Sequence, residues 1–262
     1  LNGDDKRFHL GARGQLEKLY RTQGKFEEAK KQIQLAIELA EELDILNPIK
    51  WFRLELSYIY SITGEQKKAL TEIDLVMEEI KEGQDRDLRM WVLFAKSFVL
   101  SKMESFDEAE KVADTLKSVI EEGIKEKEIR LYYLVRGMIE LERANLSEAV
   151  ELLQEALSLL PAQSVASSDQ AFYIYPLASA YYASRDLDRA REEFTKITLL
   201  TLGRERLGDL YAKSFYMLGK IYDEQGNSLK AKENYEKFLD LWKDADAGIP
   251  EVEETKKKLA GL

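Results

Sequence analysis

The chain has 262 residues, of which 45% are hydrophobic, and its 49 acidic residues outnumber its 39 basic residues to give a net charge of −10. That balance argues against binding to nucleic acid and to an anionic membrane surface, because both need clustered lysine and arginine. The absence of cysteine excludes disulfides and cysteine-based metal sites. No apolar run reaches the ~18–20 residues that a membrane-spanning helix needs. We therefore expect a cytoplasmic protein that binds neither nucleic acid nor membrane.

One ten-residue pattern recurs six times, and each copy ends in alanine. The first copy reads YRTQGKFEEA and the second reads YSITGEQKKA. The terminal alanines follow one another at intervals of 40 or 41 residues: Ala29, Ala69, Ala109, Ala149, Ala190 and Ala231. A fixed period of this size is typical of a solenoid, in which one supersecondary unit is stacked many times.

Each period is predicted to form two antiparallel helices joined by a short turn. In the first, Gly24 allows the turn, and Phe26, Ala29 and Ile33 follow at the spacing of an amphipathic helix. The predicted hairpins cover the chain in this order: 10–43, 48–83, 86–123, 127–161, 169–203 and 206–243. A helix over 250–260 is expected to cap the last hairpin. The sequence thus predicts a single all-α domain over residues 1–262, a solenoid of six antiparallel helical hairpins with thirteen helices.

Some residues are expected to mark the ends of these helices. Asn47 has the character of an N-cap before Pro48, and Ser105 with Glu108 has the spacing of a capping box. Three glycines that follow second helices suit a left-handed C-cap: Gly83, Gly123 and Gly203. The stretch PAQSVASSD at 161–169 is predicted to be a loop.

The repeated pattern resembles the tetratricopeptide repeat family. This family has leucine, a small residue, tyrosine and glycine at fixed places before the alanine. The second copy has Leu56, Ser57, Tyr60 and Gly64 at these places. The resemblance implies a right-handed superhelix whose first helices line a concave face.

Two features depart from that family pattern. Glu104 and Ala144 replace the glycine in the third and fourth copies, and Glu140 replaces the tyrosine of the fourth. The period is 40–41 residues where the family has 34. The end of the chain is also similar to the C-terminal repeat domains of bacterial kinases and signalling regulators.

Residues suited to catalysis are scarce. His9 is the one histidine, and the sequence lacks the GxxxxGK[ST], GxGxxG and HExxH motifs. A catalytic triad or a histidine-based metal site would have to use His9 without a second histidine. We therefore expect no enzyme activity, no catalytic residue, no metal and no cofactor.

The first helices of the middle hairpins carry a second apolar stripe, which the family resemblance places on the concave face. Aromatic residues are common anchors at binding surfaces. The residues expected to contact a partner are Trp51, Tyr58, Trp91, Phe94, Phe98, Met138, Phe172, Tyr175 and Tyr182. Burial of the stripe inside the protein is the equally weighted alternative.

These observations predict a non-catalytic protein–protein interaction module that binds a peptide or partner segment in an aromatic-lined groove. Four cations near the ends of the groove are expected to meet acidic flanks of the partner: Lys18, Arg21, Lys213 and Lys220. One alternative is a ligand-sensing regulatory domain of a larger bacterial kinase, cyclase or transcription regulator. Another is a plain spacer, or a dimerisation module that forms a homodimer.

Overall fold

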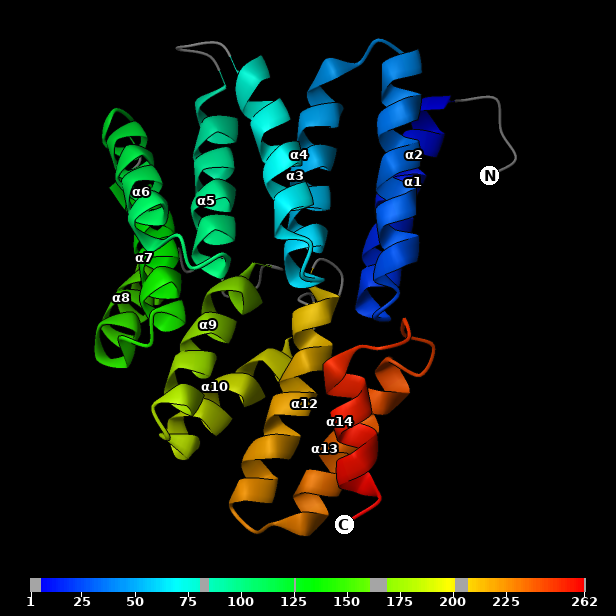
Figure 1. Cartoon of the computed structure of the whole chain (residues 1–262), viewed down its shortest axis with the longest axis vertical. Helices are drawn as coiled ribbons and strands as arrows, with labels where there is room; N and C mark the ends of the chain where they lie inside the picture. Colours follow the sequence, from blue (N-terminus) through cyan, green and yellow to red (C-terminus); the bar gives the residue numbers. More distant parts are fainter. Residues whose placement is uncertain (1–5, 81–84, 125, 161–168, 201–206, 262) are drawn as a thin grey trace. The chain divides into compact units, whose positions relative to one another are not determined.

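The computed structural model describes residues 6–80, 85–124, 126–160, 169–200 and 207–261 (Figure 1). Within these ranges it contains thirteen α-helices, one short 3-10 helix at Glu126–Ile129 (η1) and no strand. The all-α repeat fold predicted from the sequence is therefore confirmed.

The helices follow one another as hairpins, and a single helix ends the chain. The hairpins are α1 (Lys6–Thr22) with α2 (Phe26–Glu42), α3 (Leu46–Ile62) with α4 (Gln66–Glu79), α5 (Arg86–Lys102) with α6 (Phe106–Glu121), α7 (Arg130–Glu142) with α8 (Leu146–Ser158), α9 (Gln170–Ala183) with α10 (Leu187–Leu199), and α12 (Gly208–Glu224) with α13 (Ser228–Leu241). The last helix is α14 (Pro250–Leu259).

Contacts between residues divide the chain into two compact units. The first unit consists of Leu1–Glu17 and Glu28–Leu159, and the second of Lys18–Glu27 and Leu160–Leu262. The turn of the first hairpin therefore belongs to the second unit, together with the last hairpins.

The six repeat alanines are all buried, and a residue with positive φ stands five positions before each of them. These residues are Gly24, Gly64, Glu104, Ala144, Arg185 and Gly226. A small side chain at the alanine position lets the two helices of a hairpin approach closely. The repeat register predicted from the sequence is thus confirmed in every copy, including those that lack the glycine.

The ends of two helices differ from the sequence-based expectations. The N-cap of α3 is Ile45, so Asn47 lies inside the first turn and the N-cap expected there is wrong. Ser105 does precede α6, but its side chain makes no capping hydrogen bond, and the capping box is not formed. Side-chain caps occur instead at Asp186 and Asn227, which accept hydrogen bonds from backbone N–H groups three residues later.

Gly123 does not adopt the expected left-handed conformation. A Cβ atom at this position would lie 2.0 Å from Nη2 of Arg86, so the residue is glycine because the guanidinium passes directly over it. The other two glycines expected as C-caps, Gly83 and Gly203, lie outside the described residues, as does most of the predicted loop at 161–169.

The last helix, α14, packs on α13 and is joined to α12 by polar contacts along its length. Lys213 pairs with Glu251 at 2.9 Å, and Asp223 pairs with Lys258 at 2.7 Å. Because these pairs lie about three turns apart on α12 and about two turns apart on α14, α14 runs along α12 as a cap on the sixth hairpin.

Candidate binding surface

The first helices of three successive hairpins lie side by side in the first unit, since α3 contacts α5 and α5 contacts α7. Each of them carries a small, buried residue at the same position of the repeat: Ser57, Ser97 and Gly137. Ser97 Oγ donates a hydrogen bond to the carbonyl of Ala109 at 2.7 Å. A Cβ atom at Gly137 would lie 2.6 Å from Cγ of Leu153. These positions therefore fix which face of each first helix meets its second helix.

The residue after each small one lies about 100° further around the helix. In α3, α5 and α7 it is Tyr58, Phe98 and Met138, and all three are half-buried. Nζ of Lys102 lies over the Phe98 ring, 5.7 Å from its centroid. The same position in three adjacent helices thus presents a partly accessible apolar side chain.

Two tryptophans lie nearer the beginning of these helices. Trp51 is 41% exposed, and Trp91 is half-buried. Phe94 is only 5% exposed and packs edge-on against Trp91, with the ring centroids 5.8 Å apart. Phe94 thus supports Trp91 from the core and offers little surface of its own. We call Trp51, Tyr58, Trp91, Phe98 and Met138 together the inner row.

The remaining three residues expected in the groove, Phe172, Tyr175 and Tyr182, lie on α9 in the second unit and are half-buried. Tyr175 packs edge-on against Phe194 with centroids 5.4 Å apart, and burial raises the pKa of its hydroxyl. The Tyr182 hydroxyl donates a hydrogen bond to Glu224. Tyr175 and Tyr182 thus make contacts within the second unit, and neither belongs to the inner row.

Cations expected to meet acidic flanks of a partner have acidic partners within the chain. Arg21 is 2% exposed and lies 3.8 Å from Asp209. Lys213 pairs with Glu251, and Lys220 also has a carboxylate partner. The expected role is therefore wrong for Arg21, which is buried, whereas Lys213 and Lys220 are already paired with carboxylates of α14. Lys18, the fourth, is half-buried.

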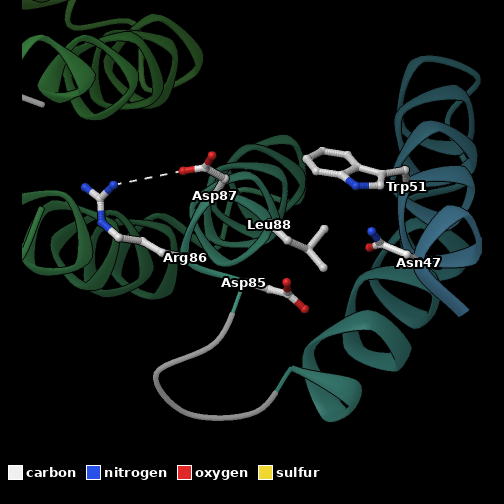
Figure 2. Close-up of a pocket in the computed structure, with 6 residues that line it drawn as sticks. All are labelled: Asn47, Trp51, Asp85, Arg86, Asp87 and Leu88. Atoms are coloured by element: carbon white, nitrogen blue, oxygen red, sulfur yellow. Dashed lines mark ion pairs between the residues drawn. The ribbon is translucent and has the colours of Figure 1, made fainter.

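An open depression of about 400 Å³ lies between the beginnings of α3 and α5 (Figure 2). It is lined by Asn47, Trp51, Asp85, Arg86, Asp87 and Leu88. Figure 2 shows Leu88 below the Trp51 indole, Asp85 below Leu88, and the Asp87 carboxylate turned toward the Arg86 guanidinium. Sequence reasoning found Trp51 but missed the two aspartates, which lie between repeats where no periodic pattern marks them.

Two further properties concern the whole described part of the chain. None of its helices is both long and apolar enough to cross a membrane. Nor do three or more His, Cys, Asp or Glu side chains come together there in a way that could hold a metal ion.

Comparison with known proteins agrees with the repeat register. The sequence profile of the tetratricopeptide repeat matches residues 18–43 and 212–241, in the first and sixth hairpins. A tetratricopeptide repeat protein from Parabacteroides merdae has a similar structure, with a TM-score of 0.56 and 14% identity over 97% of this chain and 98% of that one. Two of the six hairpins thus match the tetratricopeptide repeat profile, and the chain has the fold of such repeat proteins. Such repeats are in general non-catalytic scaffolds that bind protein partners.

Two longer proteins are also similar to this chain. One is a signal transduction ATPase with numerous domains from Pyrococcus horikoshii, which has a tetratricopeptide repeat sensor. It gives a TM-score of 0.58 and 14% identity, covering 97% of this chain and 41% of that protein. The other is protein NPGR2 of Arabidopsis thaliana, 28% identical over 128 residues, which are 49% of this chain and 16% of that protein. The chain thus spans less than half the length of either protein.

Proposed function

We propose that the chain binds an apolar or aromatic segment of a partner protein along the inner row. The observation that carries this proposal is the recurrence of Tyr58, Phe98 and Met138, which stay half-buried at one position of three adjacent helices. The corresponding positions of the fifth and sixth hairpins are Ser179 and Lys220, so the apolar character is confined to the middle repeats. In this proposal the chain is a binding module without catalytic residues of its own.

Trp91 and Phe98 are the proposed anchors of the partner segment. They lie on the middle of the three helices, where binding energy concentrates in most interfaces. Removing about 600 Å² of apolar surface from water contributes roughly 15 kcal/mol. After association costs of roughly 4–15 kcal/mol, an affinity in the micromolar range is reasonable.

The test compares the parent chain with a variant that carries both Trp91→Ala and Phe98→Ala. Each protein is immobilised and panned against a display library of random twelve-residue peptides. The parent should enrich peptides that contain several apolar or aromatic residues, and the double variant should not retain those peptides. Phe94→Ala is the comparison variant, because Phe94 packs behind Trp91 and should affect thermal stability more than peptide binding.

Two outcomes would overturn the proposal. In one, both proteins retain the selected peptides equally, so the inner row does not contact them. In the other, the double variant loses its helical circular dichroism signal, so Trp91 and Phe98 belong to the core. A variant that keeps its helicity and melting behaviour but loses the peptides supports the proposal.

A regulatory role is the second candidate. The Pyrococcus protein has a tetratricopeptide repeat sensor. The structural match covers 97% of this chain but only 41% of that protein, which is therefore much longer. In this version the inner row is the sensing surface, and occupancy by the partner segment alters the output of an attached domain. Measuring that output with the Trp91 and Phe98 substitutions, with and without a selected peptide, separates sensing from plain binding.

A further inference from the structure

We propose that the depression beside Trp51 receives an arginine side chain of the partner segment. This inference rests on the proposed function and adds a specificity to it. We call Trp51, Leu88, Asp85 and Asp87 together the Trp51 pocket. Its place at the beginning of α3 and α5 puts it beside Trp51, the first member of the inner row.

The pocket combines an aromatic face with negative charge. The indole of Trp51 stands at one side and is 41% exposed, and Leu88 forms an apolar floor. The side chains of Asp85 and Asp87 are 48% and 69% exposed, so both carboxylates can reach a ligand in the pocket. In Figure 2 the Asp87 carboxylate is turned toward the Arg86 guanidinium, and Asp85 lies below Leu88. A cation placed over the indole would lie in the depression that both carboxylates also line.

Among the residues that the structure describes, Asp85 and Asp87 form only long ion pairs with cations of the chain. Lys50 Nζ lies 3.6 Å from Asp85, and Arg86 Nη1 lies 4.0 Å from Asp87. Arg86 is engaged elsewhere, since Nη1 donates to Glu128 at 2.8 Å and its other nitrogens donate to two backbone carbonyls of α6. Long, exposed ion pairs contribute at most about 1 kcal/mol. A guanidinium from a partner can therefore replace them at little cost.

Arginine fits this pocket better than other side chains. Its planar guanidinium can stack on an indole face while its N–H groups donate to a carboxylate. Hydrogen bonds between such charged groups are about twice as strong as neutral ones. The net charge of −10 adds a general attraction for cationic segments, which salt weakens. An acidic side chain at the same place would be repelled by both aspartates.

The experiment follows the three tryptophan indole N–H signals by nuclear magnetic resonance during titration with N-acetyl-arginine amide. N-acetyl-citrulline amide, which has nearly the same shape but no charge, is the matched probe. The Trp51 signal should shift in a saturable manner with the arginine probe and respond at least about fivefold more weakly to citrulline. The signal of Trp242, which is 1% exposed, should not move.

Two double variants make the test specific. Replacing Asp85→Asn and Asp87→Asn should weaken the arginine response at least about fivefold. Replacing Asp107→Asn and Glu108→Gln removes two exposed carboxylates from α6 and should leave the response unchanged. An equal response to arginine and citrulline, an unmoved Trp51 signal, or indifference to the Asp85 and Asp87 changes would overturn the inference.

The outcomes also separate this inference from the proposed function. If panning enriches apolar peptides that lack arginine and the Trp51 signal ignores the arginine probe, the inference fails while the proposed function stands. If the Trp51 signal responds but no peptide depends on Trp91 and Phe98, the proposed function fails. Support for both requires that the enriched peptides contain an arginine. Replacing this arginine by citrulline should weaken binding to the parent, but it should not change binding to the Asp85 and Asp87 double variant.

Discussion

The indole Nε1 of Trp242 donates a hydrogen bond to the backbone carbonyl of Thr22 at 3.1 Å, although 220 positions separate the two residues. Phe26 meets the same indole edge-on, with ring centroids 5.6 Å apart. Gly24 lies between them with a φ of 70°, and a Cβ atom there would come within 2.8 Å of the Trp242 ring. Within the second unit, the turn of the first hairpin is therefore packed against the end of the last hairpin.

Asp246 completes this contact by capping α2. Its carboxylate accepts a hydrogen bond from the backbone N–H of Glu27 at 2.9 Å, and its own N–H donates to the Gly24 carbonyl at 3.1 Å. Asp246→Ala should lower the free energy of unfolding by about 1 kcal/mol, measured by urea titration, because a helix N-cap is lost. Asp244→Ala is the control, since Asp244 is exposed and 3.6 Å from Lys25, and it should change stability by less than about 0.5 kcal/mol. Equal effects of the two substitutions would show that the cap contributes nothing.

The turn position of the repeats offers a second pair of variants. Ala144 adopts a φ of 66°, where Gly64 has 85°. Because the left-handed conformation strains any residue with a Cβ atom, Ala144→Gly should raise the free energy of unfolding by about 0.5–1 kcal/mol. Gly64→Ala should lower it by about 1 kcal/mol, although nothing lies within 4 Å of the added Cβ. Thermal or urea unfolding measures both changes, and a loss of stability in Ala144→Gly would contradict the argument.

These turns show which parts of the fold are visible in the sequence. The contact between two helices demands a small residue, so alanines such as Ala109 and Ala149 recur and reveal the register. The turn tolerates Glu104 or Ala144 at a modest energetic cost, so its glycine is a weaker signal. The contact between Thr22 and Trp242 leaves no local pattern, because the two residues are 220 positions apart in the sequence.

The candidate site also has features that are visible in the sequence and others that only the packing of the helices reveals. Helical spacing placed Phe94 and Phe98 on one stripe, but the two differ in burial, because the neighbouring first helices cover one and leave the other partly accessible. Asp85 and Asp87 lie outside the repeated pattern, and only the packing of α3 beside α5 brings them to Trp51. The sequence thus predicted a stripe of apolar residues but not which of its members are accessible.

Arg86 and Gly123 form a pair that the sequence did not connect. Arg86 donates hydrogen bonds to the carbonyls of Val119 and Ile120 at the end of α6, and to Glu128, which is 7% exposed. Arg86→Ala should lower the free energy of unfolding by about 2–3 kcal/mol, because these carbonyls and a largely buried carboxylate lose the guanidinium. Urea unfolding monitored by circular dichroism measures this change.

A double-mutant cycle separates the packing role of Gly123 from any conformational one. In the parent, Gly123→Ala should cost about 1–2 kcal/mol, because the added Cβ would meet Nη2 of Arg86 at 2.0 Å. In the Arg86→Ala background the same change should cost almost nothing, because the obstructing group is gone. A cost that persists without the guanidinium would mean that Gly123 is required by its backbone conformation.

Stability at acidic pH should depend on Glu65, which joins the first and second hairpins. Its carboxylate accepts hydrogen bonds from Lys30 and Lys68, both at 2.6 Å, and from Thr63 at 3.1 Å. Burial alone would raise the pKa of Glu65, but these donors outweigh it and hold the pKa at about 2. Since the pKa is about 4.5 in the unfolded chain, folding favours the ionised carboxylate.

The contribution of Glu65 is therefore fully present above about pH 5 and is lost as the pH falls through 4.5 toward 2. Urea unfolding at several pH values between about 7 and 3 should show that Glu65→Gln lowers stability at neutral pH by on the order of 1 kcal/mol. The difference between this variant and the parent should shrink as the pH falls below about 4.5, because the unfolded parent then binds a proton that the folded carboxylate does not. Glu78→Gln, at an exposed position of α4, should follow the parent at every pH. A difference between Glu65→Gln and the parent that stays constant with pH would mean that the Lys30–Glu65 contact stabilises the fold by packing and not through the charge of the carboxylate.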